Sequence, residues 1–263
     1  MKNTNEKRRR PAPAAPAEEI EGQLEGRNAL TEALRSGRTV DKVFIAAGEI
    51  DRGLQRLAAE AKDAGAVVVP VDRRKLDAMS TTHSHQGVIA LVAAHEYASI
   101  DDILEEAASR GETALIVICD ELSDPHNLGA IMRSAECAGA HGVIIPKRRS
   151  VGLTATVAKA SAGAVEYMKV ARVTNINQAI AELKEKGVWI FGTAAEGSIP
   201  MYKADLTGPT AIVIANEGQG MSPLVRKNCD VTVHIPMKGR ISSLNASAAA
   251  SILLYEAVRQ RLG

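Results

Sequence analysis

The chain has 263 residues, of which 46% are hydrophobic, 24% are charged and 3% are aromatic, and its formal net charge is +1. An apolar fraction this large excludes a disordered or fibrous chain, and without a run of 18 apolar residues we expect no membrane span. The shortage of aromatic residues argues against RNA binding by a stacking platform, which relies on exposed rings.

The first residues are basic and rich in proline and alanine. Residues 1–10 hold five Lys or Arg against one Glu, a net of +4, so the total of +1 leaves −3 for the rest. Because this stretch lacks an apolar run, we expect 1–19 to be a flexible tail and not a secretory signal. Nucleic-acid binding would then use local basic clusters, although any one of them could be ordinary surface charge. These clusters are Arg73-Arg74-Lys75, Lys147-Arg148-Arg149, Arg226-Lys227, and Lys238 with Arg240.

Cysteine and histidine are few and scattered. Cys119, Cys137 and Cys229 suit a reducing cytoplasm better than a disulfide framework or a zinc site, and Cys137 reads as a small core residue. His83 and His85 have no Cys or Asp at ligand spacing. We therefore expect a cytoplasmic protein without a bound metal.

Apolar spacing predicts a self-contained α/β unit over residues 20–95. Its expected helices are 28–34, 51–64 and 72–79, and its expected strands are 42–47, 66–71 and 87–94. The charged segment 96–111 is interpreted as a linker.

Residues 112–263 predict a second α/β unit with a mostly parallel sheet, because short apolar runs alternate with helical stretches. The expected strands are 114–119, 142–146, 167–173, 188–193, 210–216 and 231–236, and the expected helices are 129–138, 154–162, 176–186, 223–228 and 244–261. Ligands bind beyond the carboxyl ends of such strands, so the loops there are the candidate sites.

The loop after the first strand of this unit contains Asp124-Pro125, a turn signal, and Asn127, a candidate helix cap. Arg133 would follow about one turn into the helix, where the macrodipole disfavours a cation. An anion such as a phosphate would offset this penalty. A surface ion pair with Glu136 is an equally good interpretation.

Two later loops also carry polar residues. The loop 216–222 places two glycines around Gln219, but Pro223 replaces the third glycine of a dinucleotide fingerprint. In the loop 235–247, Ser242 or Ser243 is the expected cap of the last helix.

Together these loops resemble the signature motifs of the SpoU-type (TrmH) family of RNA ribose 2′-O-methyltransferases in the SPOUT superfamily. The matching stretches are Asn127-Leu128-Gly129 with Arg133, Asn216-Glu217-Gly218 with Gly220, and Ile235-Pro236-Met237 with Ser243-Leu244-Asn245 and Ser247. The stretch from GRNALTEAL to HQGVIALV resembles the ribosomal-protein-like RNA-binding domain that precedes the catalytic domain in many members. The similarity covers about residues 22–262, and the most similar group is the bacterial 23S ribosomal RNA guanosine-2′-O-methyltransferases (RlmB-like).

The resemblance implies a trefoil-knotted domain at 112–263 that binds S-adenosylmethionine and forms a homodimer, with 20–95 binding RNA. It assigns cofactor binding to Thr193, Ala194, Gly197, Ala215, Asn216, Gly218, Gly220, Ile235, Met237, Ser243 and Leu244. It assigns catalysis to Arg133, Asn127, Glu217, Ser243 and Asn245. The chain departs from the family pattern at Ala215, usually Gly, and at Ala246, often Val.

Arginine is a poor proton acceptor because its pKa lies far above neutral pH. Arg133 is therefore expected to clamp a phosphate and stabilise charge on the 2′-oxygen. Two alternatives stay open: a transfer RNA methyltransferase of the same family, and a non-catalytic RNA-binding or ribosome-assembly factor. An oxidoreductase is disfavoured by the missing dinucleotide fingerprint.

Overall fold

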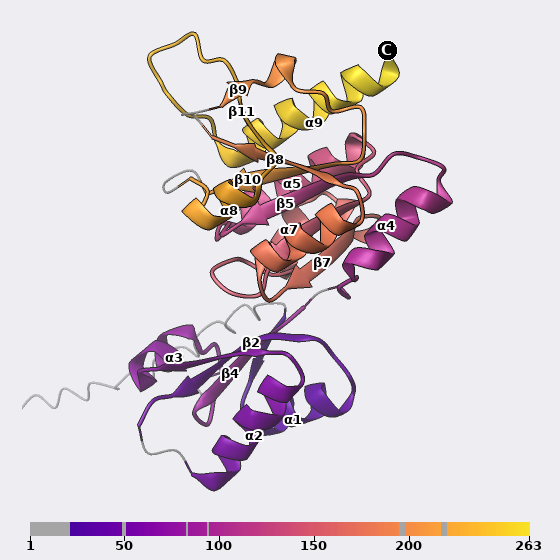
Figure 1. Ribbon diagram of the computed structural model, residues 1–263. Helices are drawn as coiled ribbons and strands as arrows, with labels where there is room; N and C mark the ends of the chain where they lie inside the picture. Colours follow the sequence, from indigo (N-terminus) through magenta and orange to yellow (C-terminus); the bar gives the residue numbers. More distant parts are fainter. Residues whose placement is uncertain (1–21, 49–50, 83, 94, 195–197, 217–219) are drawn as a thin grey trace, which may run out of the picture.

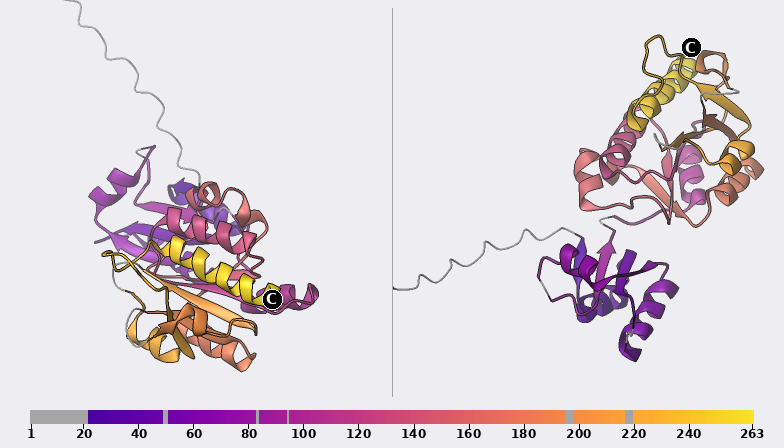
Figure 2. Two further views of the ribbon diagram at one scale, coloured as in Figure 1. Left: turned by 90° about the horizontal axis from the view of Figure 1, so that it is seen from above. Right: turned by 90° about the vertical axis from the view of Figure 1, so that its left-hand side faces the viewer.

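The computed structural model describes residues 22–48, 51–82, 84–93, 95–194, 198–216 and 220–263. Two α/β units lie one above the other and are joined by the segment between β4 and α4 (Figures 1 and 2). The tail expected over 1–19 lies outside the described residues. None of the helices within these ranges is both long and apolar enough to span a membrane.

The first unit has a sheet in the order β1-β4-β2-β3, in which β2 and β3 are parallel and the other two pairings are antiparallel. Its strands are β1 (Gln23–Glu25), β2 (Val40–Ala46), β3 (Val67–Val71) and β4 (Val88–Val92). Helices α1 (Arg27–Arg35) and α2 (Arg52–Asp63) cover one face, and α3 (Arg73–Met79) covers the other. The sequence did not predict β1, which has only three residues.

The Glu25 carboxylate, in β1, holds the loop that follows α3. It accepts hydrogen bonds from the hydroxyls of Ser80, Thr81 and Thr82 and from the backbone N–H groups of Thr81 and Thr82, at 2.5–3.2 Å. Burial opposes the charged form, but these bonds outweigh it and lower the pKa of Glu25 far below its usual range. The charged form of Glu25 is therefore the one that the fold stabilises.

We expect the substitution Glu25→Gln to destabilise the first unit by about 1–2 kcal/mol at neutral pH, because several bonds to a charged acceptor are lost. Since folding lowers the pKa, these bonds contribute fully above the usual value of 4.5 and are lost as pH falls below it. Thermal unfolding across an acidic pH series checks this. The gap between wild type and variant should narrow toward acid, and a constant gap would contradict the assignment.

The second unit is built on one parallel sheet, as expected. In the described part of the chain its strands run in the order β7-β6-β5-β10-β8-β11-β9, and every pairing is parallel. Their bounds are β5 (Leu115–Asp120), β6 (Gly142–Pro146), β7 (Lys169–Val173), β8 (Trp189–Thr193), β9 (Ile199–Pro200), β10 (Thr210–Ala215) and β11 (Val231–His234). The chain leaves β5 in one direction and later returns beside it as β10, which makes this position a topological switch point.

Helices cover both faces of the second sheet. One face packs against α5 (Pro125–Cys137), α6 (Ala155–Ala160) and α9 (Ala246–Leu262), and the other against α4 (Ile100–Ser109), α7 (Ile176–Glu185) and α8 (Pro223–Asn228). Short 3-10 helices occupy Ala164–Glu166 and Met201–Lys203. The segment 96–111 differs from the expected linker, because Ile100, Ile103 and Ala107 of α4 lie in the core of the second unit.

A buried ion pair joins the two units. Arg172 of β7 donates to the Asp41 carboxylate of β2 at 2.6 Å, and the two side chains are only 7% and 6% exposed. The Tyr97 hydroxyl donates to the same carboxylate and accepts from Leu153 N–H. A Cβ on Gly152 would overlap both Asp41 and Tyr97, so only glycine permits this approach.

Hydrogen bonds join the last turn of α9 to the edge of the second sheet at which β5 and β10 begin. The Arg261 guanidinium donates to the backbone carbonyls of Thr113, Ala114, Leu206 and Gly208 at 2.7–3.1 Å. Thr113 and Ala114 directly precede β5, and Gly208 lies just before β10. One side chain therefore ties the carboxyl-terminal helix to the starts of two central strands.

Candidate S-adenosylmethionine pocket

A pocket of about 350 Å³ opens beyond the carboxyl ends of β8 and β11. It is lined by Thr193, Ala194, Val233, His234, Ile235, Met237, Ser242, Ser243, Leu244, Ala249 and Leu253. Two stretches of the sequence thus meet here: the end of β8, and the continuous stretch formed by β11, the β11–α9 loop and the first turns of α9. Six of the residues expected to bind cofactor line this pocket: Thr193, Ala194, Ile235, Met237, Ser243 and Leu244.

The remaining predicted cofactor residues lie elsewhere or outside the described residues. Ala215 ends β10, and Asn216 and Gly220 form a bridge beyond it, in which Gly220 N–H donates to the Asn216 carbonyl at 2.9 Å. None of these three lines the 350 Å³ pocket. Gly197 and Gly218 fall outside the described residues.

The pocket lining suits a nucleoside-like ligand. Its described residues include no Asp, Glu, Lys or Arg, and its walls combine aliphatic side chains with hydroxyl groups and backbone. The Thr193 hydroxyl donates to the Val213 carbonyl, and His234 Nδ1 lies 2.8 Å from Ser198 Oγ. Such a lining fits the adenosine portion of S-adenosylmethionine.

Sequence reasoning missed Val233, His234, Ala249 and Leu253 of this lining, and it named Ser242 only as a candidate helix cap within the loop 235–247. Two of them carried a usable signal. Ala249 and Leu253 are four residues apart and therefore share one face of a helix. The other residues reach the pocket because β11 pairs with β8, and local sequence spacing does not predict that pairing.

Asn127 and Asn245 meet beside the start of α9. The Asn245 amide donates to Asn127 Oδ1 at 2.8 Å, and its own oxygen accepts from Ser247 and from the N–H of Ala248. The predicted caps were wrong at both helices. Asp124 caps α5, and Asn127 lies buried inside that helix. Asn245 caps α9 in place of Ser242 or Ser243.

Arg133 lies on the exposed side of α5. Because α5 begins at Pro125, Arg133 is the ninth of its 13 residues and lies more than two turns from the N-terminus. The prediction that Arg133 lies near the N-terminus of its helix, where the macrodipole disfavours a cation, is therefore wrong. Among the described residues Arg133 has neither a hydrogen bond nor an ion pair, so the alternative pairing with Glu136 is not seen. Cys137, expected in the core, is exposed.

Asp120, which the sequence analysis did not single out, sits at the switch point. It ends β5, is 5% exposed and accepts from Ser222 N–H across the neighbouring loop at 3.3 Å. Burial raises the pKa of this carboxyl. An acid that directly follows a fully apolar strand was the available signal. Of the other site candidates, Glu217 and His83 lie outside the described residues, within which no three potential metal ligands cluster.

Comparison with known proteins follows the division into two units. Residues 114–255 match the model of the SpoU rRNA Methylase family, and residues 23–98 match the RNA 2′-O ribose methyltransferase substrate-binding model. YacO of Bacillus subtilis (strain 168) is 48% identical over 236 residues, which cover 90% of this chain and 94% of YacO. A Staphylococcus haemolyticus relative is 46% identical at the same coverage. The names of both relatives place them among TrmH family tRNA/rRNA methyltransferases.

Solved structures agree with these matches. The SpoU methyltransferase AviRb from Streptomyces viridochromogenes, in complex with AdoMet, is 28% identical with a TM-score of 0.59, and the match covers 91% of this chain and 90% of AviRb. The A. aeolicus TrmH/SpoU tRNA modifying enzyme is 30% identical with a TM-score of 0.53, and the match covers 61% of this chain and 85% of that enzyme. The chain therefore belongs to the SpoU/TrmH family of RNA methyltransferases.

Proposed function

We propose that this protein transfers a methyl group from S-adenosylmethionine to a ribose 2′-hydroxyl, and that its target is a guanosine of 23S ribosomal RNA. The observation that carries the proposal is the pocket beyond β8 and β11, where Thr193 at the end of β8 meets Ile235 and Leu244 of the β11–α9 loop. S-adenosylmethionine supplies an electrophilic methyl group. We further propose that the carboxyl-terminal segment is threaded as a trefoil knot.

The protein's own residues would position the RNA. Arg133 holds a phosphate beside the target ribose and stabilises negative charge on the 2′-oxygen, while a phosphate oxygen or water accepts the proton of the 2′-hydroxyl. Asn127, fixed by the bond from Asn245, orients the ribose or Arg133. Glu217 would hold Arg133 or a backbone amide. Ser243 would supply a further polar group at the site.

Ribosomal RNA is favoured over transfer RNA by the first unit. The A. aeolicus tRNA modifying enzyme aligns with only 61% of this chain, which is too little to span both units. A separate RNA-binding unit suits a large folded RNA better than a small one. A transfer RNA target is the alternative outcome.

Two measurements test the proposed function. Calorimetry should detect S-adenosylmethionine binding to the purified protein, and its absence would favour an assembly factor without catalysis. Mapping of 2′-O-methyl groups in RNA from cells with and without the gene should show one missing site in 23S ribosomal RNA. A missing site in transfer RNA would redirect the target, and an unchanged map would overturn the activity.

Asn245 has two separable roles. We expect Asn245→Asp to keep the helix cap, because a carboxylate still accepts from Ser247 and Ala248, but to lose the amide bond to Asn127. Asn245→Ala should lose both, at a cost of about 1 kcal/mol in stability. Thermal unfolding and methyl transfer, measured on both variants, separate these roles. If the Asp variant methylates RNA at the wild-type rate, the Asn245–Asn127 bond has no part in catalysis.

We also propose a homodimer that forms through α9. Ile252 and Tyr255 project from this helix and are 36% and 52% exposed, while Leu253 and Leu254 lie in the core. Apolar side chains on the outer face of a helix mark an interaction surface. Ile252→Glu should therefore convert a dimer into a monomer in sedimentation velocity, whereas Lys159→Glu on α6, which packs against α5, should not. Unchanged sedimentation of the Ile252 variant would exclude this face.

A further inference from the structure

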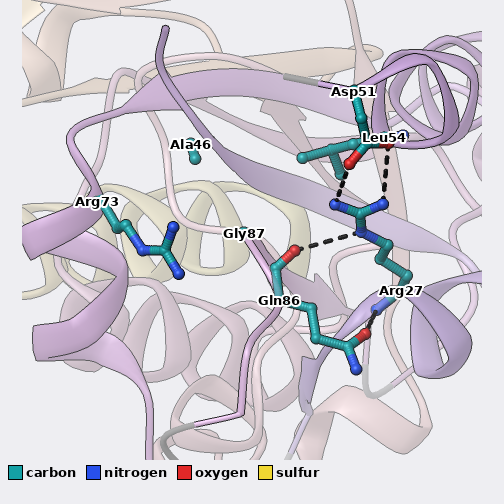
Figure 3. A pocket seen from close by; sticks show the side chains of 7 residues that line it. All are labelled: Arg27, Ala46, Asp51, Leu54, Arg73, Gln86 and Gly87. Carbon is teal, nitrogen blue, oxygen red and sulfur yellow. Dashed lines mark hydrogen bonds and ion pairs between the residues drawn. The ribbon is translucent and has the colours of Figure 1, made fainter. Parts of the chain in front are cut away.

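A second, larger pocket of about 540 Å³ lies in the first unit and has no part in the proposed methyl transfer (Figure 3). It is lined by Arg27, Ala46, Asp51, Leu54, Arg73, Gln86 and Gly87. Its volume falls within the range of roughly 300–1,000 Å³ that is typical of sites for small organic groups. The pocket can therefore hold more than a single ion.

The floor of this pocket is small and apolar. It consists of Ala46 from the end of β2, Leu54 from α2, and Gly87. Gly87 has a φ of +82°, and an added Cβ would lie 3.3 Å from Leu54 Cδ2. Glycine is thus needed both for the turn and for the depth of the pocket.

One wall of the pocket is a fixed ion pair. The Arg27 guanidinium donates to both carboxylate oxygens of Asp51, at 2.9 and 2.6 Å, and its Nε donates to the Gln86 carbonyl at 3.3 Å. The Arg27 backbone N–H donates to the Gln86 side chain (Figure 3). The charge of Arg27 is therefore already balanced, and this wall is rigid.

Arg73 supplies the uncompensated charge. It is exposed at the start of α3, and its guanidinium extends toward the pocket from the side opposite Arg27 (Figure 3). It has no hydrogen bond or ion pair with any of the described residues. A planar guanidinium matches the geometry of a phosphate group and can bind it through two parallel bonds.

His85 links the turn at Gly87 to helix α3. It is buried below the turn, where its Nδ1 accepts from Gly87 N–H at 3.0 Å and its Nε2 lies 2.9 Å from Asp77 Oδ1 on α3. Because Nδ1 accepts, Nε2 carries the proton that is donated to Asp77. The turn that forms the floor and the helix that carries Arg73 are thus held in one arrangement before any ligand binds.

The positive surface extends from the pocket along β2 and α3. Lys42 and Lys75 both lie over the ring of Phe44, at 6.0 and 5.8 Å from its centroid. Phe44 and Lys42 share the face of β2 to which Ala46 belongs, since alternate residues of a strand point the same way. An extended basic strip of this kind suits a polyanion chain better than a small free anion.

We propose that this pocket holds one unpaired nucleotide of the RNA substrate, with the base against Ala46, Leu54 and Gly87 and the phosphate on Arg73. The nucleotide must be unpaired, because a base inside a duplex cannot enter a pocket. This inference rests on the proposed function, since RNA as the ligand follows from the match of 23–98 to an RNA substrate-binding model. The substrate is then a loop or bulge that is read at a second point away from the methylated ribose.

The test compares matched variants for binding of a labelled oligouridylate and of its duplex with oligoadenylate, by fluorescence anisotropy over a salt series. Arg73→Ala should weaken oligouridylate binding about tenfold and reduce the salt slope by about 0.7, as the loss of one phosphate contact predicts. Arg38→Ala, which removes an exposed arginine between α1 and β2 that lies outside both the pocket lining and the basic strip, should change oligouridylate binding by less than about twofold. Duplex binding should change equally little in both variants.

A second pair of variants tests the floor without changing charge. Ala46→Leu fills the pocket and should weaken oligouridylate binding without altering the salt slope, whereas exposed Ala47→Leu should not weaken it. Equal losses in Arg73→Ala and Arg38→Ala, an equally large loss for duplex, or identical binding by the two leucine variants would overturn the proposal. S-adenosylmethionine binding by the same proteins is read separately, so failure of the methyltransferase assignment and failure of this pocket are distinguishable.

Discussion

Arg133→Ala is expected to abolish methyl transfer while leaving S-adenosylmethionine affinity unchanged. The exposed Arg133 has no partner among the described residues that would give it a structural role, so its removal should not disturb α5. Loss of a preorganised charge at a reacting oxygen typically lowers turnover by about a hundredfold or more. Single-turnover transfer of labelled methyl to ribosomal RNA, together with calorimetry of cofactor binding, checks both halves of this expectation.

The matched control is Arg110→Ala. Arg110 is also exposed, but it follows α4 on the opposite face of the sheet, where it pairs with Glu106. Its loss should change turnover by no more than about twofold. Arg133→Lys should rescue poorly, because a point charge cannot replace a planar fork. Turnover near the wild-type rate in Arg133→Ala would exclude this residue from the chemistry.

Asp41→Ala is expected to have the largest effect on stability, at about 3–5 kcal/mol, because it leaves Arg172 buried without its carboxylate. The chain offers a built-in probe, since Trp189 is its single tryptophan and lies in β8 of the second unit. Guanidinium unfolding followed by tryptophan fluorescence therefore reports the second unit, while far-UV circular dichroism reports both. In the variant, the unfolding curve from tryptophan fluorescence and the curve from circular dichroism should no longer coincide.

The double variant Asp41→Ala with Arg172→Met provides the control. It removes the orphaned charge and should recover part of the lost stability, since an apolar side chain tolerates burial. Burial, followed by the adjacent Asp41 carboxylate, raises the pKa of Tyr97, and because burial remains when Asp41 is removed, Tyr97 should keep its proton in both variants. A loss below about 0.5 kcal/mol in Asp41→Ala would show that the ion pair is not what joins the units.

Most strands could be predicted from the sequence, because a strand buried on both faces is a continuous apolar run bounded by turns. β6 was predicted at its observed bounds, Gly142–Pro146. The two-residue strand β9 was missed, since pairing with β11 defines it and no local pattern does. The start of α5 was placed too late because Pro125 was taken as a turn residue, although proline is well tolerated in the first turn of a helix.

The candidate site was less predictable than the fold. Ser242, Ser243 and Asn245 are all good capping residues, and the structure assigns the cap to Asn245, which also bonds Asn127, 118 positions away. Likewise, Thr193 and Leu244 meet only because β11 lies next to β8, and strand order is not encoded in local spacing. The family resemblance supplied these long-range associations, which periodicity could not.

The attachment of Arg261 has a consequence for the pocket that we propose holds S-adenosylmethionine. Helix α9 spans 17 residues, or about 25 Å, with Ala249 and Leu253 in the pocket wall near one end and Arg261 bonded to four carbonyls at the other. Because a helix behaves as a stiff unit, loss of the contacts at the C-terminal end of α9 should also loosen the packing of its N-terminal end, which lines the pocket. Shortening the chain by only its last three residues should therefore weaken S-adenosylmethionine affinity from a distance, without removing a single group that could touch the ligand.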